Sequence, residues 1–200
     1  MNDSFILRDR NWREANERVT LSSNATFSNN SKGREVEEEP DLFRTIFERD
    51  RDRIIHSKAF RRLKHKTQVF MNPDGDHFIT RMTHTLQVTQ IGRSIAKTLG
   101  LNPDLTEAIC LGHDVGHSPF GHTGEDVLDE MLDTGWSHSE NSVKIFKQIE
   151  PLNLSYETIN GIKFHPWKYE ETPETPEAMI CRFADRIAYL THDVEAVSYT

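Results

Sequence analysis

The sequence predicts an all-α protein, a helical bundle with one small β-hairpin near residues 67–79. Two observations indicate helices. Apolar residues recur every three to four positions in most segments, and capping residues, glycine or proline stand where these patterns start and stop. With 36% hydrophobic and 28% charged residues, the chain of 200 residues has the composition of a globular protein of one domain.

The N-terminal 40 residues are expected to be a separate, partly flexible segment. Residues 20–34 are rich in serine and asparagine and are followed by EVEEEP, a composition typical of a linker. Order is therefore expected to begin near Pro40, and residues 41–200 form the domain. Its first apolar pattern predicts one long or broken helix over residues 41–66.

A hairpin and a strongly capped helix are expected next. The turn sequence Asn-Pro-Asp-Gly follows a short β-type run, which predicts the hairpin. Thr80 can then cap a helix that runs to Leu99, where Gly100 ends it. Within this helix an apolar stripe continues back from Val88 to His84, so His84 is expected to point into the core.

The following helix leads into the most polar part of the predicted core. Asn102 before Pro103 is a strong helix start, and the helix runs inward to residues 113 and 114 before Gly116 and Pro119 bend or end it. Later helices are expected over residues 123–132, 139–149, 156–163 and 176–197.

Composition excludes several classes of protein. A net charge of −8 argues against general coating of nucleic acids. No apolar run approaches the roughly 20 residues of a membrane span, and the N-terminus lacks a signal-peptide core, so a cytoplasmic protein without membrane contact is expected. Cys110 and Cys181 both lie in apolar helical patterns and are expected in the core, which leaves no disulfide framework and no zinc cage.

Basic residues are concentrated in one short segment. A third of all Lys and Arg lie between Arg49 and Lys66. Such a run indicates either a local site for an anion or the solvated face of a helix.

The segment CLGHDVGHSPFGH at residues 110–122 carries the clearest chemical signal. Burying so many imidazole and carboxylate groups without partners would be costly, and a metal ion or a catalytic network would remove that cost. The same argument applies to Asp185, because its neighbours on the predicted helix are apolar. A lone buried histidine is usually a hydrogen-bonded core residue, but two imidazoles and two carboxylates form a mixed nitrogen and oxygen site that suits manganese, iron, magnesium or nickel.

A second pattern of polar residues begins at the end of this segment. His122 and Glu125 are three residues apart at the start of a helix, the spacing at which a carboxylate can orient an imidazole for general acid or base catalysis. The sequence His113-Asp114-x-x-His117 also imitates the HExxH helix of zinc proteases, but Gly116 and Pro119 disfavour a straight helix through it.

Taken in order, these motifs resemble a known family. The order His84, His113-Asp114, Asp185 resembles the HD-domain metal phosphohydrolases, which are all-α. Four segments are similar to signatures of its deoxynucleoside triphosphate triphosphohydrolases of the dGTPase-like type, from about Phe43 to Val197: KAFRRLKHKTQVF, TRMTHTLQVTQIGRSIA, LGHDVGHSPFGHTGED and ADRIAYLTHDVEA.

The resemblance implies a role for each matching residue. One divalent ion, Mn²⁺, Mg²⁺, Fe²⁺ or Ni²⁺, would be bound by His84, His113, Asp114 and Asp185. The catalytic residues would be His122, Glu125 and His117. Substrate would be bound by Arg81, Arg61, Arg62, Arg186, Tyr189 and Asp193, with Tyr189 under the sugar.

The activity implied is hydrolysis of a deoxynucleoside triphosphate (dNTP) to deoxynucleoside and inorganic triphosphate. Two alternatives stay open: an HD phosphohydrolase for nucleoside monophosphates or cyclic nucleotides, and a relative that binds nucleotide or single-stranded DNA without turnover. The resemblance also implies a homo-oligomer, with a nucleotide effector or single-stranded DNA as further candidate partners. Family members are longer, so the family's C-terminal helices are expected to be missing from this chain.

Overall fold

The computed structural model of the chain describes residues 6–68 and 79–193. These residues are mainly helical, and within them the only β-type pairings are isolated bridges. The all-α prediction is therefore confirmed. The α-helices are α1 (Arg10–Thr20), α2 (Ile46–His56), α3 (Lys58–Arg62), α4 (Arg81–Leu99), α5 (Pro103–Gly112), α6 (Gly121–Met131), α7 (His138–Lys144), α8 (Tyr156–Phe164) and α9 (Pro176–Ala188).

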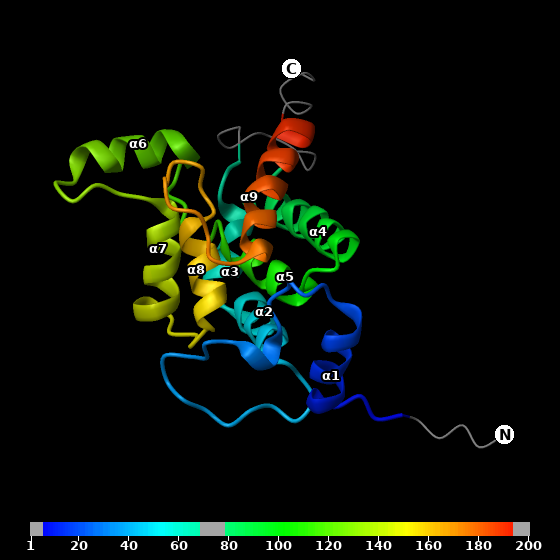
Figure 1. The fold of residues 1–200 in the computed structure, drawn as a ribbon. Helices are drawn as coiled ribbons and strands as arrows, with labels where there is room; N and C mark the ends of the chain where they lie inside the picture. The colour runs from blue at the N-terminus through cyan, green and yellow to red at the C-terminus, as the bar shows by residue number, and fades with distance from the viewer. Residues whose placement is uncertain (1–5, 69–78, 194–200) are drawn as a thin grey trace.

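Helix α5 lies at the centre of the bundle. It packs against α2, α4, α8 and α9, so these four helices are placed relative to it (Figure 1). Its apolar side chains are fully buried, with Leu105 and Ile109 at 0% exposure. The C-terminal end of α5 is thereby directed into the region where α4, α8 and α9 meet.

Local sequence explains the ends of α4 and α5. Thr80 accepts a hydrogen bond from the backbone N–H of Thr83, and Gly100 ends α4 with a φ of 67°, a left-handed conformation that favours glycine. Asn102 accepts hydrogen bonds from two N–H groups of the first turn of α5, where Pro103 has no N–H to satisfy. Both helix starts were predicted from these residues.

The segment 41–66 is a broken helix. Ser57 follows the last residue of α2, and its hydroxyl accepts a hydrogen bond from the N–H of Phe60, which starts α3 as a new helix. A short 3₁₀ turn, Leu63–His65, follows α3. Two other helices end in π-helical turns, Ile145–Ile149 after α7 and Tyr189–Asp193 after α9.

The predicted β-hairpin is not supported. Residues 69–78, which contain its turn, lie outside the described residues. On its flanks, Thr67 and Thr80 form one isolated antiparallel bridge and no ladder. The reason is visible at Thr80, which caps α4, so that the chain leaves the extended conformation at the next residue.

The N-terminal segment differs from the expected linker. It contains α1 and a 3₁₀ turn, Ser28–Asn30. Its polar groups donate hydrogen bonds to buried carboxylates of the helical domain. Thr26 donates to Glu177 through its N–H and its hydroxyl, and Glu157 accepts from the hydroxyl of Ser31 and the N–H of Lys32. Side chains in the later helices thus hold the Ser/Asn-rich stretch against α8 and α9, which a composition argument does not detect.

No helix among residues 6–68 and 79–193 combines the length and the apolar character needed to cross a lipid bilayer.

Candidate metal centre and active site

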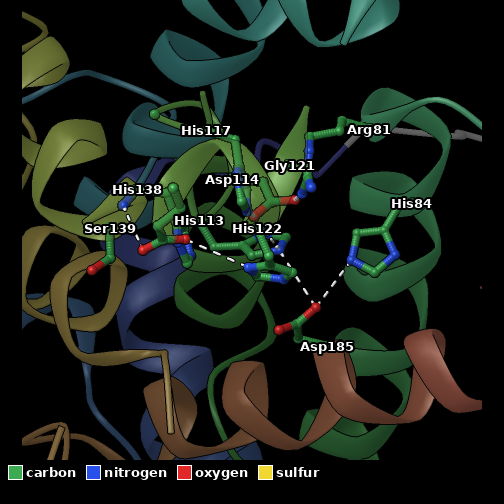
Figure 2. A network of polar contacts seen from close by, with 12 residues as sticks. Arg81, His84, His113, Asp114, His117, Gly121, His122, His138, Ser139 and Asp185 are labelled. Atoms are coloured by element: carbon green, nitrogen blue, oxygen red, sulfur yellow. Dashed lines mark hydrogen bonds and ion pairs between the residues drawn. The ribbon is translucent and has the colours of Figure 1, made fainter. Parts of the chain in front are cut away.

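Two histidines and two aspartates from three parts of the chain converge beside the end of α5. His84 lies on α4, His113 and Asp114 directly follow α5, and Asp185 lies on α9. His84 Nε2 is 3.0 Å from Asp185 Oδ1, and His113 Nε2 is 3.8 Å from the same oxygen and 3.5 Å from Asp114 Oδ1. Figure 2 shows the four side chains directed toward one another.

These separations fit a shared cation. Ligand atoms at about 2.1 Å from one ion, at right or tetrahedral angles to each other, lie about 3.0–3.4 Å apart. Two of the three measured separations are within about 0.1 Å of that range, and the third needs a small side-chain rotation. His84, His113 and Asp185 thus form a cluster able to hold a divalent metal ion, and His113 also groups with Asp114 and His165 in the same way.

The hydrogen bonds of His113 support this interpretation. Its Nδ1 donates to the carbonyl of Cys110 at 2.7 Å, so in the neutral ring the lone pair is on Nε2. Nε2 is buried and has no hydrogen-bond partner among the described residues, although it faces two carboxylates. A histidine with its other nitrogen bound to a backbone carbonyl is the usual metal-ligating arrangement.

The electrostatics of the cluster favour a positive charge at its centre. Burial alone would lower the pKa of His113, but the charges of Asp114 and Asp185 raise it to about 9. Burial would raise the pKa of Asp185, yet the hydrogen bond from His84 and the nearby His113 lower it. A proton on His113 and a divalent cation would compete for the same carboxylates, so the cluster attracts cations in either form.

The two carboxylate oxygens of Asp114 have different neighbours. Arg81 Nη1 donates to Asp114 Oδ2 at 2.7 Å, and both side chains are buried, at 3% and 5% exposure. Oδ1 faces His113 and also lies 3.7 Å from His117 Nε2. Arg81 therefore fixes the orientation of the carboxylate and leaves Oδ1 directed toward the metal cluster.

The turn after α5 is held by backbone contacts with α7. The N–H of Gly116 donates to Ser142 Oγ at 2.9 Å, and a Cβ on Gly116 would lie 2.2 Å from the backbone nitrogen of Ser142. Lys66 donates to the carbonyls of Val115 and His117, at 2.8 Å each. Burial lowers the pKa of Lys66 to about 8. Glycine is required at position 116 because two backbone segments approach so closely.

A second group of polar side chains surrounds Glu125. Its Oε2 accepts from His138 Nδ1 at 2.7 Å and lies 3.5 Å from His122 Nδ1, and its Oε1 accepts from Lys168 at 3.0 Å. Burial would raise the pKa of Glu125, but these hydrogen bonds lower it far below its usual range. The hydrogen bond to Glu125 raises the pKa of His122. The pair of His122 and Glu125 predicted from the sequence is therefore in contact, with Glu125 ionised.

This second group could also be considered a metal site, because His117, His122, Glu125 and His138 lie close together. The rings of His117 and His138, however, are stacked 4.2 Å apart and within 5° of parallel. A metal ion lies near the plane of an imidazole that binds it, and two stacked planes share no such position. The arrangement fits a hydrogen-bonded network better than a second ion.

Members of both groups line one cavity of about 380 Å³. That size is within the usual range for small-molecule sites, about 300–1,000 Å³. Its walls are formed by Gln68, Arg81, His84, Asp114, His122, His138, His165, Pro166, Trp167, Asp185, Arg186, Tyr189 and Leu190.

Several residues expected to bind substrate lie elsewhere or outside the described side chains. Arg186 and Tyr189 line this cavity with Arg81, whereas Arg62 lines a different one of about 980 Å³ together with His117, and Arg61 is exposed on α3. Asp193 is the last residue of the π-helical turn after α9, and its side chain is not described.

Sequence reasoning missed His138 and Lys168. His138 lies in a polar stretch without apolar periodicity, and Lys168 lies in a loop, so neither shows a local pattern. The structure also buries His165 against His138. The sole sequence signal was an unusual number of histidines, ten in the chain.

Comparison with known proteins agrees with the geometry. The chain is 54% identical over 179 residues to the deoxyguanosinetriphosphate triphosphohydrolase-like protein of Caldanaerobacter subterraneus subsp. tengcongensis, which covers 88% of this chain and 52% of that protein. The protein of the same name from Clostridium tetani is 48% identical over 201 residues, which cover 96% of this chain and 57% of that protein. The one from Geobacter sulfurreducens is 46% identical over 199 residues, which cover 90% of this chain and 52% of that protein. The chain spans about half the length of the curated relatives it matches.

The HD domain family matches residues 81–190, more than half of the chain. The match begins at the first residue of α4 and ends beyond α9, so it includes both histidines and both aspartates of the cluster. By this match and this geometry, the chain belongs to the HD domain family.

Proposed function

We propose that the protein hydrolyses deoxynucleoside triphosphates to deoxynucleoside and inorganic triphosphate, in a reaction that requires one divalent metal ion. The observation that carries the proposal is that His84, Asp114 and Asp185 line one cavity together with His122 and His138, the two histidines beside Glu125. A metal ligand set, an acid–base pair and cationic groups within one cavity are the components that phosphoryl hydrolysis needs. The names of the relatives support dGTP or a similar nucleotide as the substrate.

In this proposal His84, His113, Asp114 and Asp185 hold the ion. When bound, the ion, whether Mn²⁺, Mg²⁺, Fe²⁺ or Ni²⁺, supplies Lewis acidity that polarises the phosphoryl oxygens. Arg81 and Arg186 face the same cavity and offset the negative charge of the phosphate chain.

His122 and Glu125 carry the proton transfer. Ionised Glu125 orients the ring of His122, which takes a proton from water as the water oxygen attacks the α-phosphorus. The bond between that phosphorus and the 5′ oxygen breaks, the 5′ oxygen takes a proton from solvent as the deoxynucleoside leaves, and the three phosphates leave together. His122 then releases its proton to solvent, which balances the step. His117, whose Nε2 lies 3.7 Å from Asp114 Oδ1, is proposed to contact the reacting phosphate.

Tyr189 is proposed to lie under the sugar, where a 2′ hydroxyl would meet the ring. It follows Asp185 by one helical turn and lines the cavity, which places it on the same wall as the metal ligands.

The test is to incubate the purified protein with each dNTP and Mn²⁺ or Mg²⁺ and to separate the products by anion exchange. Deoxynucleoside and triphosphate are expected, with no turnover in excess EDTA. Asp126→Asn, a change on the exposed face of α6, is the matched control for His122→Gln and should stay active.

Other products would reject parts of the proposal. Monophosphate and pyrophosphate would reject cleavage at the 5′ oxygen. Turnover only of nucleoside monophosphates or cyclic nucleotides would identify a different HD phosphohydrolase, and nucleotide binding without product in the presence of metal would identify a relative that only binds nucleotide or single-stranded DNA.

A further inference from the structure

The cavity beside the metal cluster has an apolar part as well as a charged one. Most of its polar lining residues are arginine, histidine or aspartate, and these surround the proposed reaction centre. The remaining lining residues are Pro166, Trp167, Tyr189 and Leu190. They come from two segments only, the loop between α8 and α9 and the turn that follows α9 (Figure 1). Such a lining suits a ligand that is charged at one end and flat and apolar at the other.

Trp167 is the largest of these apolar side chains, and its ring is held from several directions. The indole Nε1 donates to the carbonyl oxygen of Arg182 at 3.2 Å, and the ring meets Phe183 almost edge-on, with 5.2 Å between centroids and 78° between planes. The guanidinium groups of Arg182 and Arg186 lie over the ring at 5.2 and 5.9 Å, within the range of about 6 Å for a cation–π contact. Trp167 is nevertheless 46% exposed. Its ring is therefore fixed in orientation and still has surface left for a ligand.

The loop that carries Trp167 is fixed in turn by Arg182. This arginine is 4% exposed and donates hydrogen bonds to backbone carbonyls of the loop and of the end of α8, those of Phe164, His165, Pro166 and Glu171. Among the residues that the structure describes it forms no ion pair, so these carbonyls are the groups that satisfy its guanidinium. The next residue after Trp167, Lys168, donates to Glu125 at 3.0 Å. A ligand that meets Trp167 does not have to order the loop first, which lowers the cost of binding.

The chemistry of a dNTP assigns an occupant to this surface. Its base is flat and apolar on both faces, and bases stack on aromatic side chains whatever their hydrogen-bonding edge. Apart from histidines, the aromatic residues of the cavity lining are Trp167 and Tyr189. Tyr189 is proposed to lie under the sugar, which leaves the indole for the base.

We propose that Trp167 is the platform on which the base of the nucleotide stacks. This inference rests on the proposed function, because it assigns a position to one part of the proposed substrate. Stacking of this kind adds affinity for the nucleotide and does not by itself select one base.

The test compares two ligands that differ only in the base. These are dGTP and a deoxyribose 5′-triphosphate without a base, titrated by calorimetry in Mg²⁺ into the full chain carrying His122→Gln, which slows turnover. Adding Trp167→Ala should weaken the binding of dGTP about 5- to 150-fold, the usual value of one stacked base. Binding of the ligand without a base should stay unchanged. Trp167→Phe keeps an aromatic ring and should restore most of the affinity for dGTP.

Two results would overturn the inference. Unchanged binding of dGTP by Trp167→Ala would show that the base lies elsewhere, and an equal loss for both ligands would show that the indole only supports the cavity wall. The matched control is Trp12→Ala. Trp12 is 37% exposed and also lies under an arginine, Arg8, at 4.6 Å, but it lines a different cavity, so its loss should leave both affinities unchanged.

A second measurement does not require the alanine variant to fold. The chain has three tryptophans, which can be labelled as 5-fluorotryptophan and assigned in ¹⁹F NMR by single Trp→Phe changes. The signal of Trp167 should shift with dGTP and not with the ligand that lacks a base, because only a stacked base places a ring current beside the indole. A signal that responds alike to both ligands, or to neither, contradicts the inference.

These outcomes are separable from those for the proposed function. Base-dependent binding at Trp167 by a protein that hydrolyses no dNTP would count against the proposed function alone. Hydrolysis of dGTP with an affinity that does not depend on Trp167 would count against this inference alone. Failure of both ligands to bind would reject the two together.

Discussion

His84 Nε2 on α4 lies 3.0 Å from Asp185 Oδ1 on α9, although the two residues are 101 positions apart in the chain. The contact exists because α4 and α9 pack against each other and against α5, whose C-terminal end brings His113 to the same point. A metal site assembled in this way depends on each of its carboxylates as a source of negative charge.

Replacing Asp185 by asparagine should weaken metal binding. The amide keeps the shape of the side chain but removes its charge, and ligand-sphere changes of this kind cost at least about 10- to 100-fold in affinity. Titration calorimetry with Mn²⁺, together with elemental analysis after dialysis, measures the loss. Asp126→Asn makes the same change on an exposed surface of α6 and should bind metal like the wild type. Equal metal content in both variants would remove Asp185 from the ligand set.

The pH dependence of activity should follow His122. As a general base His122 must be neutral, and the hydrogen bond to Glu125 raises its pKa, so kcat/KM should rise with pH through a value above the ordinary range near 6.5. In Glu125→Gln the anion that raises this pKa is gone. The rise should therefore move to lower pH, while kcat falls about 10²- to 10⁴-fold.

The same profile has a clear control. His122→Gln should lack the rise altogether, because no group with that pKa remains at the position. A rise that stays at the same pH in Glu125→Gln would show that the titrating base is a different residue.

The buried ion pair between Asp50 and Arg34 should be important for stability. Asp50 is 0% exposed and accepts hydrogen bonds from Arg34, from Ser155 and from Thr158, so it joins the N-terminal segment to α2 and α8. Asp50→Ala removes the fully buried partner of Arg34, whose ion pair with the more exposed Glu38 remains, and should lower the free energy of unfolding by about 3 kcal/mol.

Urea denaturation at constant m-value measures this difference. The matched control is Asp52→Ala, which breaks the more exposed pair with Arg44, where the arginine side chain is 46% exposed. That change should cost no more than about 1 kcal/mol. Similar losses for both variants would contradict a special role for the buried pair.

Tyr189 should determine the choice of sugar if the proposed function holds. Tyr189→Ala opens space on the cavity wall, so the ratio of kcat/KM for dGTP to that for GTP should fall about 10-fold or more, in line with the 1–3 kcal/mol that steric fit supplies in such pockets. Tyr189→Phe keeps the ring and should preserve the ratio. Discrimination that survives in Tyr189→Ala would place sugar recognition on another residue.

Much of the fold could be predicted from local sequence. The starts of α4 and α5 depend on Thr80 and Asn102, whose side chains bind N–H groups only two or three residues away. His84 was expected in the core from its spacing to Val88, and it is 2% exposed. These features rest on interactions within a turn of helix, so a single chain segment contains all the information they need.

Other features could not be predicted from the local sequence. Arg62 resembles a phosphate-binding residue in the sequence, yet it lines a different cavity from the histidine–aspartate cluster. The Ser/Asn-rich stretch has the composition of a linker, yet Glu157 and Glu177 bind it from more than 120 residues away. Composition describes what a segment can do alone, and these contacts depend on partners elsewhere in the chain.

The sequence by itself determined the helical character of this protein, the positions where its main helices begin, and the residue types able to hold a cation. Only the tertiary structure decided which of them meet. In the tertiary structure His138 lies between Glu125 and His165, Arg81 forms an ion pair with Asp114, and Arg62 lines a different cavity from the metal cluster. The physical reason is that helix formation is governed by neighbours within a few residues, whereas convergence is governed by how helices pack around α5.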